Sequence, residues 1–119
     1  MKVNPEARTK EEPRQARAGA CLVHYRASHT VLHILERQNF FIGRSPRCNM
    51  VLSSGKVSRQ HAIIRNQGGS YEIFDCASTN GVVVNGERIR TRVLSDGDRI
   101  VVGPREIEFR ILGAQEVKP

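Results

Sequence analysis

The sequence has no tryptophan, and only four phenylalanines and two tyrosines stand among its 119 residues. A long apolar run is also missing, since the longest uninterrupted stretch is the four residues Ala20 to Val23. A membrane-spanning helix needs about 20 such residues. The N-terminus mixes basic and acidic residues and lacks the apolar segment of a secretory signal. We therefore expect a soluble, intracellular chain, long enough for one domain with one hydrophobic core.

Cysteine is scarce, with three residues at positions 21, 48 and 76. The number is odd and the spacing shows no pairs, which is typical of small buried side chains in a reducing compartment. We expect that compartment to be the cytoplasm, or the nucleus of a eukaryotic cell. A metal site built from Cys21, His24, His29 and His33 is disfavoured, because Cys21 and His24 would point to opposite faces of a strand.

Acidic residues are outnumbered, with 12 Asp and Glu against 19 Lys and Arg, which gives a net charge of +7. Fifteen of the 19 basic residues are arginines, whose planar fork suits phosphate and carboxylate groups. The charge predicts an anionic partner. It does not distinguish a nucleic acid from an acidic lipid surface or a phosphorylated protein.

No window has the apolar spacing of an amphipathic helix, and short apolar runs separated by turn residues predict strands instead. The clearest is Glu106 to Ile111, in which apolar and charged residues alternate. The other runs begin near residues 21, 30, 39, 50, 61, 71, 81 and 99. This spacing predicts an all-β, two-sheet antiparallel sandwich over residues 20–112. Residues 1–19 and 113–119 are expected to be flexible tails, because residues 1–19 in particular have almost nothing apolar to bury.

Polar residues that strand patterning does not explain occur in three segments, 43–47, 56–61 and 77–81. Each is expected at a strand end or in a loop, where a rigid sandwich can present side chains to a ligand. Arg44, Ser58, Arg59 and Thr79 together offer two guanidinium groups and two hydroxyls, which are suitable donors to a phosphate dianion. The alternative is that the arginines are solvated and that serine and asparagine only cap turns.

Seven segments resemble, in order, the forkhead-associated (FHA) family, whose members are β-sandwiches that bind phosphothreonine peptides. They are F-I-G-R at 41–44, V-S-R-Q-H-A-I-I at 57–64, Y-E-I-F-D at 71–75, S-T-N-G at 78–81, V-N-G at 84–86, L-S-D-G-D-R-I-V-V-G at 94–103 and I-E-F at 107–109. The resemblance covers most of the chain that is expected to be ordered. One segment alone would be weak support, because Asn-Gly and Gly-Arg are common in the turns of β proteins.

The resemblance implies a role for each matching residue. Arg44 would contact the phosphate or the adjacent peptide backbone, Ser58 would donate to a phosphate oxygen, and Arg59 would add a further phosphate contact. Thr79 would donate through its hydroxyl or backbone N–H, and Asn80 would hold the peptide backbone beside the phosphothreonine.

The same resemblance implies supporting roles for Gly43 and Gly81, which would shape turns, and for His61, which would hold the Ser58 loop. Cys76-Ala77 stands where the family often has Leu-Gly, and Val82 where Thr is frequent. We expect these departures to affect the preference for residues that follow the phosphothreonine.

The sequence therefore predicts a phosphothreonine-dependent interaction module in Ser/Thr kinase signalling, with a kinase or its substrates as partner and no cofactor. A catalytic role is not expected, since no acidic residue is placed to orient His61 beside Ser58. A phosphorylated Thr9, which lies between Arg8 and Lys10, could also bind the domain's own site or that of a neighbour.

Two alternatives stay open. A basic nucleic-acid-binding β domain would suit the net charge, although the sequence lacks the interleaved aromatics on which single strands stack. An interaction module of the same fold could also bind without phosphate through an exposed sheet face.

Overall fold

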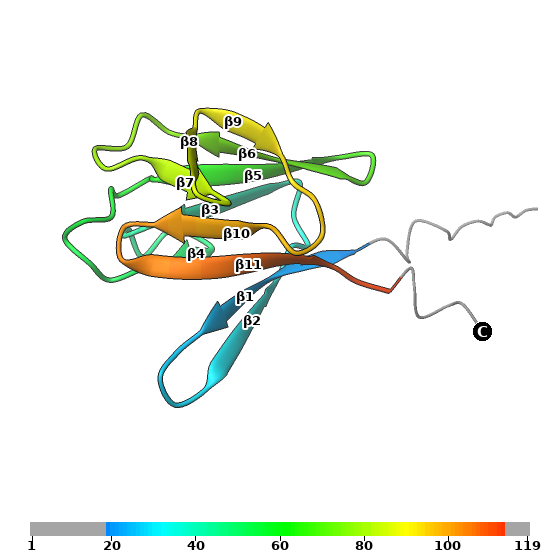
Figure 1. Cartoon of the computed structure of the whole chain (residues 1–119), viewed down its shortest axis with the longest axis horizontal. Helices are drawn as coiled ribbons and strands as arrows, with labels where there is room; N and C mark the ends of the chain where they lie inside the picture. The colour runs from blue at the N-terminus through cyan, green and yellow to red at the C-terminus, as the bar shows by residue number, and fades with distance from the viewer. Residues whose placement is uncertain (1–18, 114–119) are drawn as a thin grey trace, which may run out of the picture.

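The computed structural model describes residues 19–113 and shows eleven strands and no helix in that range (Figure 1). None of the described residues therefore forms a helix able to cross a membrane. The strands are β1 Ala20–Tyr25, β2 Thr30–Ile34, β3 Asn39–Gly43, β4 Met50–Val51, β5 Ala62–Gln67, β6 Ser70–Asp75, β7 Val82–Val84, β8 Glu87–Ile89, β9 Thr91–Val93, β10 Arg99–Val102 and β11 Arg105–Ile111.

The strands form two sheets that pack face to face. One has six strands in the order β2-β1-β11-β10-β7-β8, and the other has five in the order β4-β3-β5-β6-β9. The paired strands run antiparallel except β3 and β4, which are parallel over two residue pairs. The predicted all-β, two-sheet sandwich is confirmed, with this short parallel pair as the exception to its antiparallel pairing.

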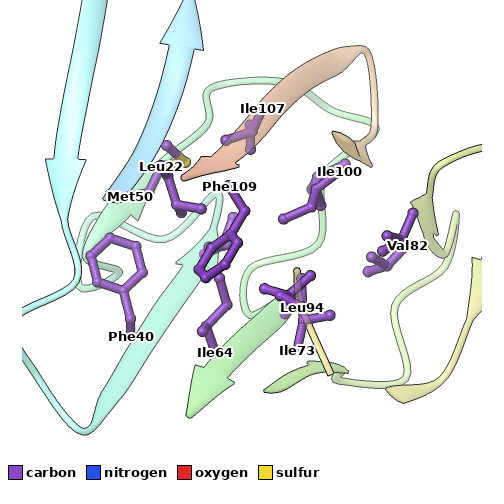
Figure 2. Close-up of a cluster of buried hydrophobic side chains, with 14 of the residues drawn as sticks. Leu22, Phe40, Met50, Ile64, Ile73, Val82, Leu94, Ile100, Ile107 and Phe109 are labelled. Atoms are coloured by element: carbon purple, nitrogen blue, oxygen red, sulfur yellow. The ribbon is translucent and has the colours of Figure 1, made fainter. Parts of the chain in front are cut away.

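The core lies between the sheets and is filled by alternate residues of the central strands (Figure 2). In β11, Ile107 and Phe109 are fully buried, while Glu106 and Arg110 face solvent. The ring of Phe109 packs against Tyr71 of the opposite sheet, with 5.4 Å between the ring centroids. The alternation of the sequence therefore fixes which face of β11 joins the two sheets.

Nine of the eleven strands overlap the runs that patterning predicts. The other two, β8 and β9, are three residues each, and only one of their six side chains, that of Ile89, is buried. Neither carries the alternating signal, because each is held by backbone pairing to one neighbour, β7 or β6. The predicted tails fall outside the described residues, apart from Gly19 and Gly113, and so does Thr9.

The three cysteines are free thiols, and two of them are buried as expected. Burial raises the pKa of Cys21 and of Cys48, so these thiols stay protonated and behave as small apolar side chains. Among the described residues, no group of three or more His, Cys, Asp and Glu side chains could hold a metal ion.

The two ends of the sandwich differ. Gly19 and Leu112 meet at one end, where the Leu112 N–H donates to the Gly19 carbonyl at 2.7 Å. The loops that follow β3, β4 and β6 lie at the opposite end (Figure 1). These loops contain the three polar segments that the sequence singles out, so the fold brings them together.

Candidate functional site

The loop after β3 is joined directly to the loop after β4. The Arg44 N–H donates to the Ser58 carbonyl at 2.9 Å, and the Ser45 N–H donates to the Arg59 carbonyl at 3.2 Å. Gly43 makes this approach possible, because a Cβ at that position would lie 2.1 Å from the Arg59 oxygen. Gly43 therefore allows the two loop backbones to pack closely, whereas the resemblance implies that it shapes a turn.

The Arg44 side chain is oriented by the same loop. Its Nε donates to the Val57 carbonyl at 3.0 Å, which leaves its terminal amino groups free to donate elsewhere. Among the described residues no carboxylate pairs with this guanidinium. An oriented arginine without an acidic partner is suited to bind an external anion.

Ser58 and Thr79 are adjacent although 21 residues separate them. The Thr79 N–H donates to Ser58 Oγ at 3.2 Å. As an acceptor in this bond, the Ser58 hydroxyl keeps its own hydrogen for a further acceptor. The Thr79 side chain is exposed beside it, so two hydroxyl groups lie on the same surface.

Asn80 ties the third loop to the second, because its Nδ2 donates to the Lys56 carbonyl at 2.8 Å. The side-chain oxygen of Asn80 and the second N–H of its amide remain for other partners. A side chain with one acceptor and one free donor can pair with an extended peptide backbone, which is the role predicted for it.

His61 lies below the loops and is fully buried. Its Nδ1 accepts from the Ser58 N–H at 2.9 Å, and its Nε2 lies 2.8 Å from the Gly81 carbonyl. These partners require a neutral ring with the hydrogen on Nε2, because an N–H can only donate and a carbonyl can only accept. His61 thus joins the Ser58 loop to the Thr79 loop, as expected of a scaffold residue.

Gly81 closes the third loop with a φ of +84°, a conformation that glycine adopts easily. Its N–H donates to Ser78 Oγ at 2.9 Å. Ala77 also has a positive φ, of 55°, at a position where the sequence departs from the family pattern. Val82, the other departure, is fully buried in the core (Figure 2), so it affects packing and makes no contact with a ligand.

A hollow of about 150 Å³ opens among these loops. The residues that line it include two cations, two hydroxyl groups and an amide but no carboxylate: Arg44, Gly55, Lys56, Val57, Ser58, Thr79 and Asn80. Four of the five predicted ligand-binding residues therefore surround one hollow. Lys56 was not predicted as a member, although it stands two positions before Ser58 in a segment that the sequence singles out.

Arg59, the fifth predicted residue, lies in a different hollow of about 360 Å³. Its neighbours there are Phe41, Ser45, Arg47, Cys48 and Gln60. The backbone bends at Val57, Arg59 and Gln60, and Arg59 and Ser58 line different hollows. The structure thus does not bring Arg59 together with the other four, and its phosphate contact stays a prediction.

Comparison with known proteins agrees with this geometry. The model of the FHA domain family matches residues 40–103, which is more than half of the chain. The oxoglutarate dehydrogenase inhibitor of Corynebacterium diphtheriae is 36% identical over 94 residues, or 79% of this chain and 66% of that protein. The transcriptional regulatory protein EmbR of Mycobacterium tuberculosis is 48% identical over 71 residues, or 59% of this chain and 18% of EmbR.

Solved structures give the same fold. Mycobacterium tuberculosis EmbR in complex with a low-affinity phosphopeptide superimposes with a TM-score of 0.74 at 38% identity, covering 82% of this chain and 25% of EmbR. A structure from a study of phosphothreonine-dependent FHA domain interactions gives 0.70 at 32% identity and covers 77% of this chain and 95% of that one. This chain spans from under a fifth to about two thirds of the curated relatives. The chain belongs to the FHA domain family.

Proposed function

We propose that this domain binds phosphothreonine-containing segments of partner proteins inside the cell, as part of Ser/Thr kinase signalling. The phosphate occupies the hollow lined by Arg44, Lys56, Ser58 and Thr79, and Asn80 pairs with the peptide backbone beside it. The partner is a kinase or a kinase substrate. The reaction is reversible binding, and no covalent bond forms or breaks.

One observation carries this proposal: an oriented arginine, a lysine and two hydroxyl groups surround a single hollow that contains no carboxylate. A phosphate at pH 7 carries a charge of about −1.5 to −2 and three acceptor oxygens, which matches that set of donors. Unphosphorylated threonine has neither the charge nor the oxygens.

The relatives support the same function. One structural neighbour is EmbR with a bound phosphopeptide, and another comes from a study of phosphothreonine-dependent interactions. The curated relatives include an enzyme inhibitor and a transcriptional regulator.

Removal of the Arg44 guanidinium tests the proposal. Hydrogen bonds to charged groups contribute about 1.5–3 kcal/mol each, and Arg44 can supply two of them. We expect Arg44→Ala to weaken binding of a phosphothreonine peptide library about 100-fold or more, measured by calorimetric titration. Phosphoserine and unphosphorylated libraries of the same composition serve as comparison ligands.

Arg47→Ala is the matched control. Arg47 is an exposed arginine of the same loop but lines the neighbouring hollow, so its loss changes the net charge equally and should leave affinity within about threefold. Saturable binding of the phosphothreonine library that is lost in Arg44→Ala alone supports the proposal. Equal losses in both variants would indicate non-specific charge attraction, as in a nucleic-acid-binding domain.

A second candidate function follows from the outer face of the six-stranded sheet. Tyr25, Leu32 and Ile34 are 59%, 59% and 45% exposed there, and together they form an apolar surface of the kind that binds proteins. Binding of a partner regardless of its phosphorylation, and lost in Leu32→Ser but kept in Arg44→Ala, would favour this phosphate-independent module.

A further inference from the structure

A third hollow, larger than the two described above, opens at the same end of the sandwich as the predicted phosphate site. Residues of the turn that joins β1 to β2 and of the turn that joins β10 to β11 line it, and its volume is about 640 Å³. Both turns lie toward the left of the view in Figure 1. We call this third hollow the hairpin cleft. Its basic and acidic side chains are three arginines, two histidines and one carboxylate: Arg26, Arg99, Arg105, His24, His29 and Glu106.

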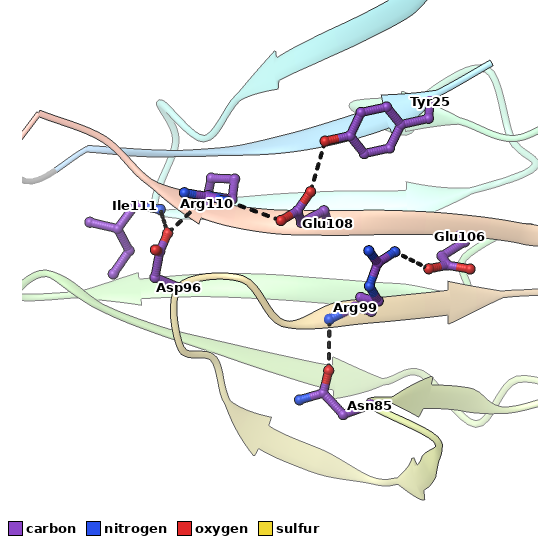
Figure 3. Close-up of polar contacts among 8 residues, drawn as sticks. All are labelled: Tyr25, Asn85, Asp96, Arg99, Glu106, Glu108, Arg110 and Ile111. Carbon is purple, nitrogen blue, oxygen red and sulfur yellow. Dashed lines mark hydrogen bonds and ion pairs between the residues drawn. The ribbon is translucent and has the colours of Figure 1, made fainter.

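The single carboxylate does not neutralise the hairpin cleft. Glu106 forms an ion pair with Arg99 (Figure 3). In the described part of the chain, neither Arg26 nor Arg105 has a carboxylate partner. Two arginines therefore remain unpaired on the wall of a concave surface, where their fields reinforce each other.

Two side chains on the wall show the effect of this excess charge. The Nε atom of Arg105 is buried, and among the described residues it has no hydrogen-bond partner, an arrangement that is unfavourable until an acceptor arrives. The pKa of His24 is lowered by burial and then by the positive charges of Arg26 and Arg105. An anion in the cleft would offset this repulsion between positive charges.

The hairpin cleft adjoins the predicted phosphate site through the β10–β11 turn. A Cβ on Gly103 would lie 2.7 Å from Cγ2 of Val57 and 3.3 Å from the Lys56 oxygen, so the turn packs against the loop that lines the phosphate hollow. The same Lys56 oxygen accepts from Asn80. The next residue along the turn, Pro104, lines the hairpin cleft, so this one turn contacts the loop of the predicted phosphate site and also lines the cleft.

We propose that the hairpin cleft is a second anion-binding site, which takes an acidic side chain or a second phosphate group of the same partner whose phosphothreonine occupies the first site. The inference rests on the proposed function, because the first site anchors the partner. Recognition then has two parts, with the phosphothreonine fixing the register and the second anion selecting among phosphorylated segments.

The test is a series of phosphothreonine peptides in which a pair of glutamates, or one phosphoserine, is placed at increasing separation on either side of the phosphothreonine. A parent peptide carries glutamine at those positions. We expect one separation to lower the Kd about fivefold relative to the parent, which corresponds to one exposed ion pair at the upper end of its usual strength. Amide signals of residues 26–29, 105 and 106 should shift only with that peptide.

Arg26→Gln should abolish the gain and leave the Kd of the parent unchanged, and Arg105→Gln should do the same. Arg37→Gln is the matched control: it is also an exposed turn arginine next to β2, but it lies at the other end of that strand. It should keep the gain. Because Arg26 is exposed, its replacement does not disturb packing, so the test does not depend on the partly buried Arg105.

Three results would overturn the proposal. The first is that no separation lowers the Kd while the parent still binds, and the second is that the gain persists in Arg26→Gln. The third is binding of a single-stranded oligonucleotide that is lost in Arg26→Gln and that no acidic peptide displaces, since this would assign the cleft to nucleic acid. Failure of the proposed function is distinct, because the parent peptide itself would then not bind.

Discussion

At the scale of single residues, Ala77 is out of place in its backbone conformation. Its φ of 55° lies in the left-handed region, where the Cβ of any residue other than glycine crowds the following carbonyl at a cost of about 1 kcal/mol or more. The neighbouring bonds hold it there, since the Cys76 N–H donates to the His61 carbonyl and the Ser78 N–H to Asp75. The chain therefore tolerates local strain beside the predicted phosphate site.

We expect Ala77→Gly to stabilise the domain. Relief of the strain exceeds the entropy that glycine adds to the unfolded chain, so the net gain is about 0.5–1 kcal/mol, or a rise of roughly 2–5 °C in Tm. Thermal unfolding followed by circular dichroism measures it. Ala27→Gly is the control: Ala27 is exposed in a turn without a positive φ, so it should lower the Tm slightly. Equal changes in the Tm of both variants would contradict the inference that the backbone at Ala77 is strained.

Residue types and their order were sufficient to predict Arg44, Ser58, Thr79 and Asn80, because the resemblance assigns roles position by position. The direction of a side chain was not predictable in the same way. Arg59 directly follows Ser58 in the chain, yet it lines another hollow, whereas Lys56, two positions earlier, lines the predicted phosphate site. That difference depends on the local path of the backbone, which composition and motifs do not specify.

At the scale of elements, the end of β3 and the loop before β5 behave as one unit. Two backbone hydrogen bonds join them, from Arg44 to Ser58 and from Ser45 to Arg59. A further bond from the His61 N–H to the Ile42 carbonyl continues the pairing. The unit carries Arg44 and Ser58, so its internal geometry sets the distance between a guanidinium and a hydroxyl at the predicted site.

We expect Gly43→Ala to damage both stability and binding. The new Cβ would lie 2.1 Å from the Arg59 oxygen, so β3 and the loop must separate, at a cost of about 1–3 kcal/mol in the free energy of unfolding. Urea denaturation measures the loss. Gly55→Ala is the matched control, since nothing lies within 4 Å of a Cβ there and its φ is not positive. A Gly43→Ala variant as stable as Gly55→Ala would contradict the close approach of Gly43 to the Arg59 backbone.

Elements with a strong alternating pattern were predictable, and those without one were not. The run from Glu106 to Ile111 predicts β11 because one face of the strand is buried and the other is solvated, so apolar and charged residues alternate along it. In β8, only Ile89 is buried, and in β9 no side chain is fully buried. Short edge strands of this kind are held by backbone hydrogen bonds. Most residue types can form these bonds, so such strands have no distinctive sequence pattern.

At the scale of the whole molecule, the two ends of the sandwich carry different features. The predicted phosphate site and the hairpin cleft both open among loops at one end, while Gly19 and Leu112 meet at the other. A ligand attached through the N-terminal segment can therefore reach the predicted phosphate site only if that segment spans the length of the sandwich. The six residues of β1 span about 20 Å of that path.

This geometry sharpens the expectation that phosphorylated Thr9 binds the domain's own site. Ten residue steps separate Thr9 from Gly19, and a fully extended chain of that length spans at most about 36 Å. Because the reach exceeds the length of β1, which is one part of the path to the site, we expect binding within one molecule. A chain with phosphothreonine at position 9 should then stay monomeric and should resist competition by a phosphothreonine peptide.

Deletion of residues 13–18 separates this mode from binding between molecules. It keeps Glu11 and Glu12 next to Thr9 but leaves four residue steps before Gly19, or at most about 14 Å, which is too short to pass β1. We expect the shortened phosphorylated chain to form dimers whose fraction rises with concentration, because only a neighbour's site is then within reach. Light scattering across a dilution series measures this. If the shortened chain stays monomeric yet still resists competition by a phosphothreonine peptide, the N-terminal segment does not reach the site by running along β1. If the phosphorylated chain without the deletion binds free peptide normally, Thr9 is not a ligand of the site.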